Sequence, residues 1–201
     1  MIAAVELRPD YPIATARLRL RPLSVADVDA LLTYRSRADV CRYLPFEPMT
    51  RQDLLGRLQN DLSRTEITQE GQALTLGVEL ARTRQLIGDV VLFCRSREHA
   101  GGELGYVFHP DAGSQGYATE ACTAMLALAF DQLGLHRVIA RIDARNGPSA
   151  RLAARLGMRQ EANFIRNEMF KGEWSDEIIY AMLAEEWPGS PPDLIPGRGV
   201  R

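Results

Sequence analysis

The sequence GSQGYATEA, residues 113–121, stands where a strand pattern passes into a long apolar helix pattern. Residues 104–109 before it read as a strand, and the apolar residues from 116 to 133 recur at helical spacing. Glycine suits a junction where the backbone must approach a ligand closely, because it has no Cβ. The first amides of a helix also lack partners within the helix and attract anions. The stretch therefore predicts a phosphate site made by the amides of Gln115, Gly116, Tyr117 and Ala118.

Gly113 and Gly116 also have simpler explanations. Glycines three residues apart are common at helix ends, so this spacing alone does not require a ligand. The stretch is not a Walker A loop, because no Gly-Lys-Ser/Thr follows it. It also differs from the dinucleotide-binding fingerprint, which has another glycine spacing and belongs to an early βαβ unit.

A second strand-to-helix junction follows the first. Residues 136–144 (HRVIARIDA) read as a strand, and residues 146–149 (NGPS) open another helix. Asn and Ser are good cap residues and Pro suits a first turn, so capping explains these residues locally. Capping does not explain why two such junctions lie on neighbouring strands. The pairing indicates a ligand between them, with phosphate at the first junction and an apolar arm at the second.

The remaining patterns complete one mixed α/β domain with the order β-α-α-β-β-β-α-β-α-β-β. Strands are predicted at 15–23, 73–80, 86–94, 103–108, 136–144, about 158–170 and 177–184, with residues 171–176 (KGEWSD) as the last connection. Helices are predicted after Ser24 and Thr50, at 116–133 and at 146–157. Residues 1–14 read as a loose lead-in, 15–187 as the domain, and 188–201 as a Pro/Gly-rich tail without regular structure.

Composition excludes several classes of protein. The chain has 201 residues, a net charge of −2 and arginines interleaved with acidic residues, so we expect no nucleic-acid partner. Glu6, Arg8 and Asp10 precede any long apolar run, and no run is long enough to cross a bilayer, so we expect neither a signal peptide nor a membrane partner. Three widely spaced cysteines indicate reduced thiols in the cytoplasm (Cys41, Cys94 and Cys122). The three histidines lack metal-ligand spacing, so we expect no metal.

Three stretches together resemble the GCN5-related N-acetyltransferases, the GNAT superfamily. They are ELGYVFHPDAGSQGYATEA (103–121), NGPSARLAARLGM (146–158) and GEWSDEIIYAMLAEEW (172–187). The resemblance runs from about Thr15 to Trp187, and the branch that it most resembles acetylates the amino termini of ribosomal proteins. It implies a single α/β domain with a mostly antiparallel mixed sheet. About seven strands, splayed between the fourth and fifth, and about four helices are expected.

The resemblance implies that acetyl-CoA is the cosubstrate and assigns residues to it. The turn at 113–118 would wrap the pyrophosphate, and the strand backbone at 107–109 would pair with the pantetheine arm and polarise the thioester carbonyl. Asn146 would contact the pantetheine. One departure is Gly113, where the family usually has Gln or Arg; the change removes a side chain but no amide. The expected cofactor residues are Val107, Phe108, His109, Gly113, Ser114, Gln115, Gly116, Tyr117, Ala118, Thr119, Asn146 and Ser149.

Direct attack of an amine on a thioester needs a neutral amine, a stabilised oxyanion and a protonated leaving group. Glu103, at the start of its strand, is the first candidate for the base, and Asp143 is its rival. Glu103 could instead be a surface carboxylate at a strand end. Asp143 could instead form an ion pair with Arg141 or Arg145. Alternation puts Glu103 on one face with Val107 and His109, unless the bulge usual for this strand in the family breaks that parity.

The proton donor for the leaving thiolate departs from the family pattern. Many relatives have Tyr seven residues after the Asn, and this chain has Ala153 there. Ser149 is the substitute we name, although a helix-cap hydroxyl would look the same. Tyr106, Tyr117 and solvent stay open as alternatives.

The acceptor is an amine-bearing molecule, either a protein amino terminus or a small molecule. In the branch that this chain resembles, the acceptor slot is shaped by the first two helices, the loop between them and the last hairpin. The residues that we therefore predict to bind the acceptor are Tyr43, Phe46, Trp174 and Asp176. The function predicted is acyl-CoA-dependent N-acyl transfer, with acetyl favoured over longer acyl groups such as succinyl. The alternatives are a coenzyme A-binding sensor that has lost catalysis and an interaction domain without a ligand. The oligomeric state is open, and a homodimer is one option.

Overall fold

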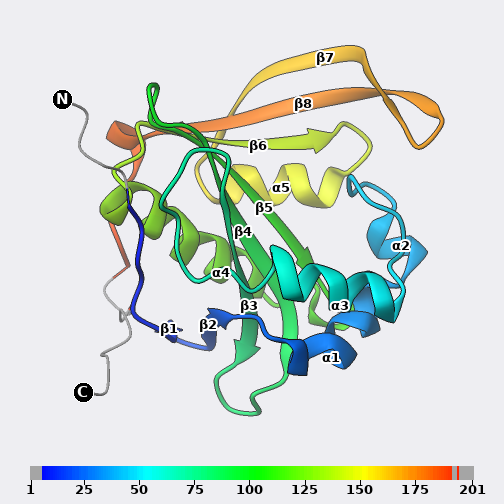
Figure 1. Ribbon diagram of the computed structural model, residues 1–201. Coiled ribbons are helices and arrows are strands. Elements are labelled where there is room, and N and C mark those ends of the chain that lie inside the picture. Colours follow the sequence, from blue (N-terminus) through cyan, green and yellow to red (C-terminus); the bar gives the residue numbers. More distant parts are fainter. Residues whose placement is uncertain (1–5, 192–193, 195–201) are drawn as a thin grey trace.

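The computed structural model describes residues 6–191 and 194 (Figure 1). The strands are β1 (Ile13–Ala14), β2 (Leu18–Pro22), β3 (Ala73–Leu80), β4 (Leu86–Ser96), β5 (Gly101–Phe108), β6 (Arg137–Asp143), β7 (Arg159–Phe170) and β8 (Glu173–Leu183). The helices are α1 (Val28–Arg35), α2 (Ala38–Cys41), α3 (Arg51–Asn60), α4 (Tyr117–Ala127) and α5 (Gly147–Arg155). A π-helical turn (Leu128–Gln132) extends α4. This confirms the predicted α/β fold, with eight strands instead of seven and five helices instead of four.

The eight strands form one sheet in the order β1-β2-β3-β4-β5-β6-β8-β7. Every neighbouring pair is antiparallel except β5 and β6, which run parallel. These two strands pair at three positions only, from Gly101–Arg137 to Glu103–Ile139, and then separate. The predicted splay is therefore present, and it begins just after Glu103.

Two hydrophobic cores cover the two faces of the sheet. The larger one joins α4 and α5 to one face through residues such as Leu104, Met125 and Leu152. The smaller one joins α1 and α3 to the other face and includes Tyr34 and Val107. Residues of β5 alternate between them, because successive side chains of a strand point to opposite faces. The bulge expected in β5 is absent from its described pairing, which runs unshifted from Gly102–Cys94 to Phe108–Gly88.

Capping residues start the helices where the sequence predicts. Asp53 and Thr50 exchange hydrogen bonds at the start of α3, since the Asp53 carboxylate accepts the Thr50 N–H at 2.8 Å and the Thr50 hydroxyl accepts the Asp53 N–H at 3.2 Å. At the start of α5 the Asn146 side-chain oxygen accepts the Ser149 N–H at 3.2 Å. Gly157 follows α5 with a φ of 86°, a conformation that glycine adopts without strain.

Three local features differ from the predicted pattern. The lead-in predicted over 1–14 contains β1, and Leu7 is buried and pairs with Ile67, so the described part of this segment belongs to the core. The short helix α2 was not predicted, because four residues hold too little periodicity to recognise. The predicted connection at 171–176 shrinks to a turn at Lys171 and Gly172, whose φ values of 50° and 86° suit a tight hairpin.

Residues 188–191 have no helix or strand, and most of the tail predicted over 188–201 lies outside the described part of the chain. All three cysteines are unpaired and buried. The described helices include none that is both long and apolar enough for a membrane span. Nor do the described residues contain a group of three or more His, Cys, Asp or Glu that could hold a metal ion.

Candidate active site

The site is built around the gap between β5 and β6. Because these strands are parallel, their carboxyl ends reach the same edge of the sheet, and the helix that follows each strand begins there (Figure 1). Beyond Glu103 the β5 backbone has no strand partner on the β6 side. This leaves N–H and C=O groups of β5 available to a ligand that carries its own amides. The two predicted junctions therefore lie on the two sides of one opening.

The glycine turn between β5 and α4 has the geometry of an anion site. Gly116 is the residue before α4 and has a φ of 79°. The first hydrogen bond of α4 is donated by the Glu120 N–H to the Gly116 carbonyl, so the three preceding helix amides have no partner within the helix. These are the amides of Tyr117, Ala118 and Thr119. An anion at this end of α4 is also favoured by the helix dipole.

The structure explains the two glycines differently. Gly116 has a left-handed φ, which favours glycine, and an added Cβ there would lie 3.3 Å from Arg17 Nη2. At Gly113 φ is an ordinary −64°, but an added Cβ would lie 2.9 Å from the Pro110 carbonyl oxygen. Ser114 adopts a φ of 60°, which strains a residue other than glycine. The Gln115 side chain folds back and donates to the Asp111 carbonyl at 3.1 Å.

The strand residues expected to bind the cofactor use their side chains elsewhere. Phe108 packs into the core beneath α4, and Val107 packs into the core beneath α1. His109 Nδ1 accepts the Asp111 N–H at 3.1 Å, and its ring meets Tyr34 edge-on with the centroids 6.5 Å apart. The side chains of Val107 and Phe108 are thus engaged in the two cores, which leaves their backbone for a ligand, the role that the resemblance implies.

The second junction brings together Tyr106 and Ser149, two of the residues considered as proton donors for the leaving thiolate. Tyr106 Oη donates to the Ser149 carbonyl at 3.3 Å, across the opening from β5 to α5. Burial raises the pKa of Tyr106 above its ordinary value, so the phenol keeps its proton at neutral pH. Asn146 caps the same helix end. Ala153, one turn after Ser149, is only 1% exposed and packs in the core.

The two candidate bases have different surroundings. Glu103 lies at the point where β5 and β6 separate, and its Oε2 accepts from Arg95 Nε at 2.9 Å. Its other carboxylate oxygen has no hydrogen bond among the described residues. Asp143 accepts from Arg145 Nε at 2.9 Å, from Arg145 Nη2 at 2.7 Å and from the Arg145 N–H at 2.9 Å. Burial acts to raise the pKa of Asp143, but these bonds outweigh it and hold the pKa below its ordinary value.

The residues suggested for the acceptor slot do not form one cluster. Tyr43 lies beside the Arg145 guanidinium, 5.8 Å from it, at the end of β6. Phe46 packs against the smaller core, with the Arg35 guanidinium 5.1 Å from its ring. Trp174, 60% exposed, and Asp176 lie within β8 and alternate with the buried Ser175 and Glu177, so they occupy the opposite face.

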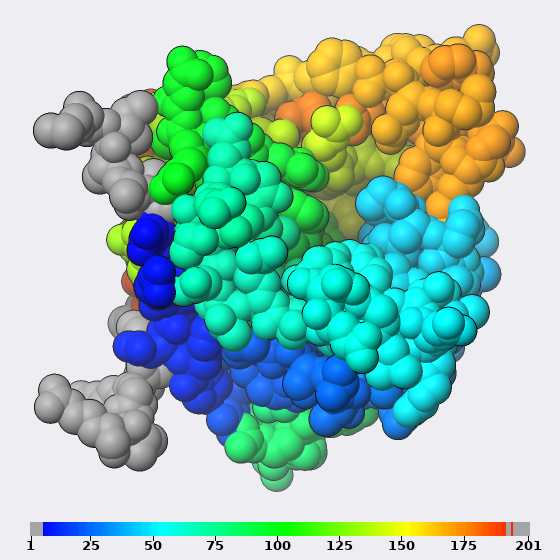
Figure 2. Space-filling model, in the orientation of Figure 1, coloured from blue at the N-terminus to red at the C-terminus, as the bar shows by residue number. Residues whose placement is uncertain are grey.

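The β7–β8 hairpin is tied to the loop after α2. Lys171 Nζ donates to the carbonyls of Cys41 at 2.8 Å and Phe46 at 2.9 Å. In the space-filling view the surface is hollowed between this hairpin and the blue-to-cyan helices, with green and yellow-green residues at the floor (Figure 2). The two bonds of Lys171 hold the hairpin against the loop after α2. The gap between β5 and β6 opens toward the same region of the molecule (Figure 1).

Two buried ionic clusters were missed by the sequence analysis. Asp89 of β4 accepts from Tyr34 Oη at 2.7 Å and from Arg35 Nη2 at 2.6 Å, and burial followed by the Asp89 charge raises the pKa of Tyr34. Glu177 of β8 accepts from Arg141 Nε at 2.8 Å and from Asn167 at 2.9 Å. The sequence holds one sign of the Asp89 cluster, because Asp89 is a charged residue within the apolar run LIGDVVLF. It holds no sign of the Glu177 cluster, because the partners of Glu177 lie on other strands.

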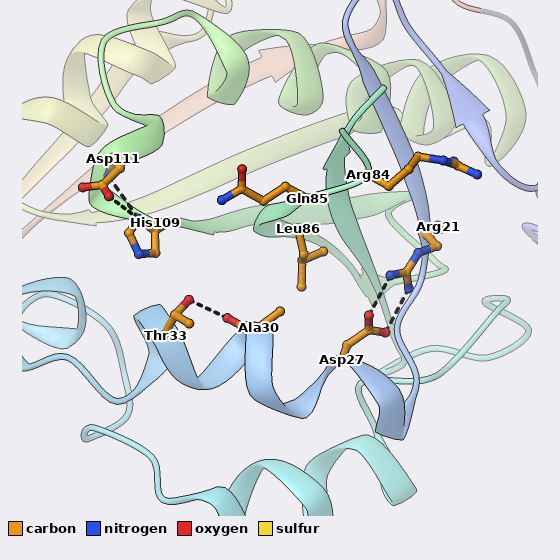
Figure 3. Close-up of a pocket in the computed structure, with 9 residues that line it drawn as sticks. All are labelled: Arg21, Asp27, Ala30, Thr33, Arg84, Gln85, Leu86, His109 and Asp111. Carbon is orange, nitrogen blue, oxygen red and sulfur yellow. Dashed lines mark hydrogen bonds and ion pairs between the residues drawn. The ribbon is translucent and has the colours of Figure 1, made fainter. Parts of the chain in front are cut away.

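A polar pocket of about 450 Å³ lies between α1 and the sheet (Figure 3). His109 and Asp111 stand at one end, and Arg21, paired with Asp27, stands at the other. The His109 side chain therefore faces the α1 side of the sheet. The residues that line the pocket are Arg21, Asp27, Ala30, Thr33, Arg84, Gln85, Leu86, His109 and Asp111.

Comparison with known proteins identifies the family of the chain. Residues 17–159 match the acetyltransferase (GNAT) domain family. The chain is a member of the GNAT acetyltransferase family. The uncharacterized N-acetyltransferase YnaD of Bacillus subtilis is 34% identical over 175 residues, which cover 87% of this chain and 98% of YnaD. The crystal structure of a GNAT-family acetyltransferase from Bacillus anthracis superimposes with a TM-score of 0.78 at 32% identity, covering 86% of this chain and 98% of that one.

A third relative has a named acceptor. The [ribosomal protein uS5]-alanine N-acetyltransferase of Escherichia coli is 29% identical over 128 residues, which cover 62% of this chain and 65% of that enzyme. The GNAT chain described here is thus an N-acetyltransferase by family. GNAT enzymes use acetyl-CoA as the acetyl donor, and the opening between β5 and β6 fits a donor that carries both amides and phosphates.

Proposed function

We propose that this GNAT enzyme binds acetyl-CoA across the opening between β5 and β6 and transfers the acetyl group to a primary amine. The observation that carries the proposal is the unpaired β5 backbone leading directly into the free amides of α4. Pantetheine has amides that can pair with the strand, and the diphosphate that follows it requires the anion site. The cofactor residues are the backbone of 107–109, the turn and first residues of α4 at 113–119, and Asn146 with Ser149.

The chemistry is a direct displacement. A base removes a proton from the ammonium form, and the neutral nitrogen attacks the thioester carbonyl carbon. A backbone N–H of β5 stabilises the oxyanion, the attacking nitrogen gives up its second proton, the C–S bond breaks, and the thiolate takes up a proton. We assign the base to Glu103, because it stands where the opening begins and keeps one carboxylate oxygen without a partner among the described residues. Asp143 is the weaker candidate, because Arg145 occupies its carboxylate.

For the proton donor the geometry favours Tyr106 and Ser149 together. Ser149 lies at the start of α5, and the hydroxyl of Tyr106, from β5, reaches within hydrogen-bond distance of the Ser149 carbonyl. The Tyr106 phenol is protonated at neutral pH, and its position is what favours it as donor, because burial raises its pKa and so makes it a weaker acid. Ala153, where many relatives have a tyrosine, is buried in the larger core.

For the acceptor we favour a protein amino terminus over a small-molecule amine. The match to the E. coli enzyme that acetylates the alanine of ribosomal protein uS5 supports this choice. The hollow between the β7–β8 hairpin and the loop after α2 is the proposed acceptor region. Tyr43, Phe46, Trp174 and Asp176 remain the candidates for acceptor contacts, although they do not form one cluster. Three unpaired cysteines accord with a cytoplasmic location, which stays part of the proposal along with a homodimer.

The test is acetyl transfer to a defined set of amines. Purified enzyme is incubated with acetyl-CoA and with peptides that have a free amino terminus, matched peptides blocked there but carrying a free lysine, and small amines including polyamines. Mass spectrometry then reports which nitrogen gains an acetyl group. Transfer to free amino termini alone is the expected result. Transfer to small amines alone would show that the acceptor is a small-molecule amine and not a protein amino terminus. Tight coenzyme A binding without transfer to any amine would instead favour a coenzyme A sensor.

A further inference from the structure

Arg17, between β1 and β2, reaches a segment almost one hundred residues further along the chain. Its Nη1 donates to the Gln115 carbonyl at 2.9 Å, and its Nε donates to Glu120 Oε2 at 2.7 Å. Its guanidinium also lies over the Tyr117 ring, 4.7 Å from the centroid. One planar side chain thus bonds to both sides of Gly116.

The bond to Gln115 bears on the direction of the Gly116 amide. In a trans peptide the C=O of one residue and the N–H of the next point in opposite directions. Arg17 holds the Gln115 C=O toward itself, so the Gly116 N–H points away from Arg17. Glycine tolerates either orientation of this peptide, because it has no Cβ to restrict φ. The bond from Arg17 therefore favours one orientation of this peptide.

Arg17 also pairs with the carboxylate of Glu120. Glu120 lies in the first turn of α4, where its negative charge would repel a bound phosphate. Its carboxylate is occupied on both oxygens, because Oε1 accepts from Thr15 Oγ1 at 2.5 Å and from the Arg17 N–H at 2.8 Å, while Oε2 accepts from Arg17 Nε. The side chain is 15% exposed. Arg17 therefore offsets the acidic group closest to the anion site in sequence.

We propose that Arg17 is a positioning residue for the coenzyme A diphosphate, acting through the Gln115–Gly116 peptide and through Glu120. The inference rests on the proposed placement of the diphosphate at this turn. No Lys or Arg occurs from 110 to 121, so the cation that serves the turn comes from a distant part of the chain. Arg17 differs from the expected cofactor residues in this respect, since all of those lie between 107 and 149.

The experiment measures ligand affinity for matched variants by titration calorimetry and competition. The variants are Arg17→Met, Arg17→Lys and the double variant Arg17→Met with Glu120→Gln. Arg51→Met is the control, because Arg51 is also a half-exposed arginine paired with a carboxylate, at 52% exposed against 48% for Arg17. The ligands are coenzyme A and, as a competitor, pantetheine, which lacks the diphosphate. Melting temperatures show that each variant is folded.

We expect Arg17→Met to weaken coenzyme A about tenfold or more, because hydrogen bonds to charged groups are among the strong ones. Pantetheine and the control should change less than about twofold. Arg17→Lys should recover part of the loss, since an ammonium can pair with Glu120 but lacks the planar fork that serves two partners. The double variant should also recover only in part, because the Gln115 carbonyl is still released.

Three results would overturn the inference. They are an unchanged coenzyme A affinity in folded Arg17→Met, equal losses for coenzyme A and pantetheine, and full recovery in the double variant. Gly116→Val, measured in the same series, separates this inference from the proposed function. If Gly116→Val weakens coenzyme A and Arg17→Met does not, only the role of Arg17 fails. If neither does, the placement of the diphosphate fails as well.

Discussion

The Tyr106 hydroxyl lies 3.3 Å from the Ser149 carbonyl oxygen, and this contact joins β5 to the start of α5 across the opening of the sheet. It is the one hydrogen bond between side chain and backbone that the described residues make from β5 to α5. Because the strands β5 and β6 have already separated there, the contact marks the floor of the proposed thioester site. It also places a protonated phenol where the sequence analysis named Ser149.

Removing the Tyr106 hydroxyl is therefore the first prediction. Tyr106→Phe should lower kcat by about tenfold, or about 1.4 kcal/mol of barrier, because a thiolate leaves with little help. Ser149→Ala should cost less than that, and Ala153→Tyr should not raise activity, because Ala153 is packed in the core and a ring would overfill the space. The measurement is kcat at saturating substrates. A loss near a thousandfold for Ser149→Ala would make Ser149 the committed acid.

The second prediction concerns the base. Glu103→Gln should lower kcat by about 10²-fold and leave the acetyl-CoA affinity nearly unchanged, since general-base catalysis contributes about 10²–10⁴-fold. Asp143→Asn should have a much smaller effect on kcat, because Arg145 already engages that carboxylate. Steady-state kinetics with the acceptor found in the transfer assay checks both. Full activity of Glu103→Gln together with loss in Asp143→Asn would move the role to Asp143.

The third prediction uses the strain at Ser114. Its φ of 60° costs a residue with a Cβ about 1–2 kcal/mol, and glycine removes that cost. Greater freedom of glycine in the unfolded chain offsets about 0.4–1 kcal/mol of the gain. Ser114→Gly should therefore raise the free energy of unfolding by about 0.5–1 kcal/mol in urea titrations. Ser114→Ala, which loses the hydroxyl but keeps the strain, is the control and should not stabilise.

The fourth prediction concerns pH. The pKa of Asp143 is lowered in the folded protein from an ordinary value of 3.8, so its pairing with Arg145 stabilises the fold above that value. This stability is lost as the pH falls through the lower, folded pKa. Arg145→Gln should thus lower the melting temperature at pH 7, and the difference from wild type should shrink below about pH 4. A difference that stays constant from pH 7 to pH 3 would contradict this account of Asp143.

Long elements with a clear period were predictable from the sequence. The strand, turn and helix around 104–133 and the capped helix at 147–155 lie where their apolar spacing and cap residues placed them. The tight turn at Lys171–Gly172 was misread as a six-residue connection, which put Trp174 and Asp176 in a loop instead of a strand. A Lys-Gly pair is a weaker hairpin signal than Asn-Gly or Asp-Gly.

The polar groups of the site were less predictable, because their partners are distant in sequence. Arg35 and Asp89 are 54 residues apart, and Arg141 and Glu177 are 36 apart. Local pattern shows where such residues sit on an element but not what they face. From the sequence alone, Arg141 and Arg145 were equal candidates to pair with Asp143; in the fold, Arg145 pairs with Asp143 and Arg141 pairs with Glu177.

The most direct test of the account is the affinity of coenzyme A for Gly116→Val beside Gly134→Val. Both glycines have a left-handed φ, 79° and 66°, so both variants suffer backbone strain, but only Gly116 lies in the proposed diphosphate turn. Titration calorimetry on the folded variants should show coenzyme A binding severely weakened in Gly116→Val and within about twofold of wild type in Gly134→Val. Equal affinity of wild type and folded Gly116→Val would contradict the placement of coenzyme A at this turn.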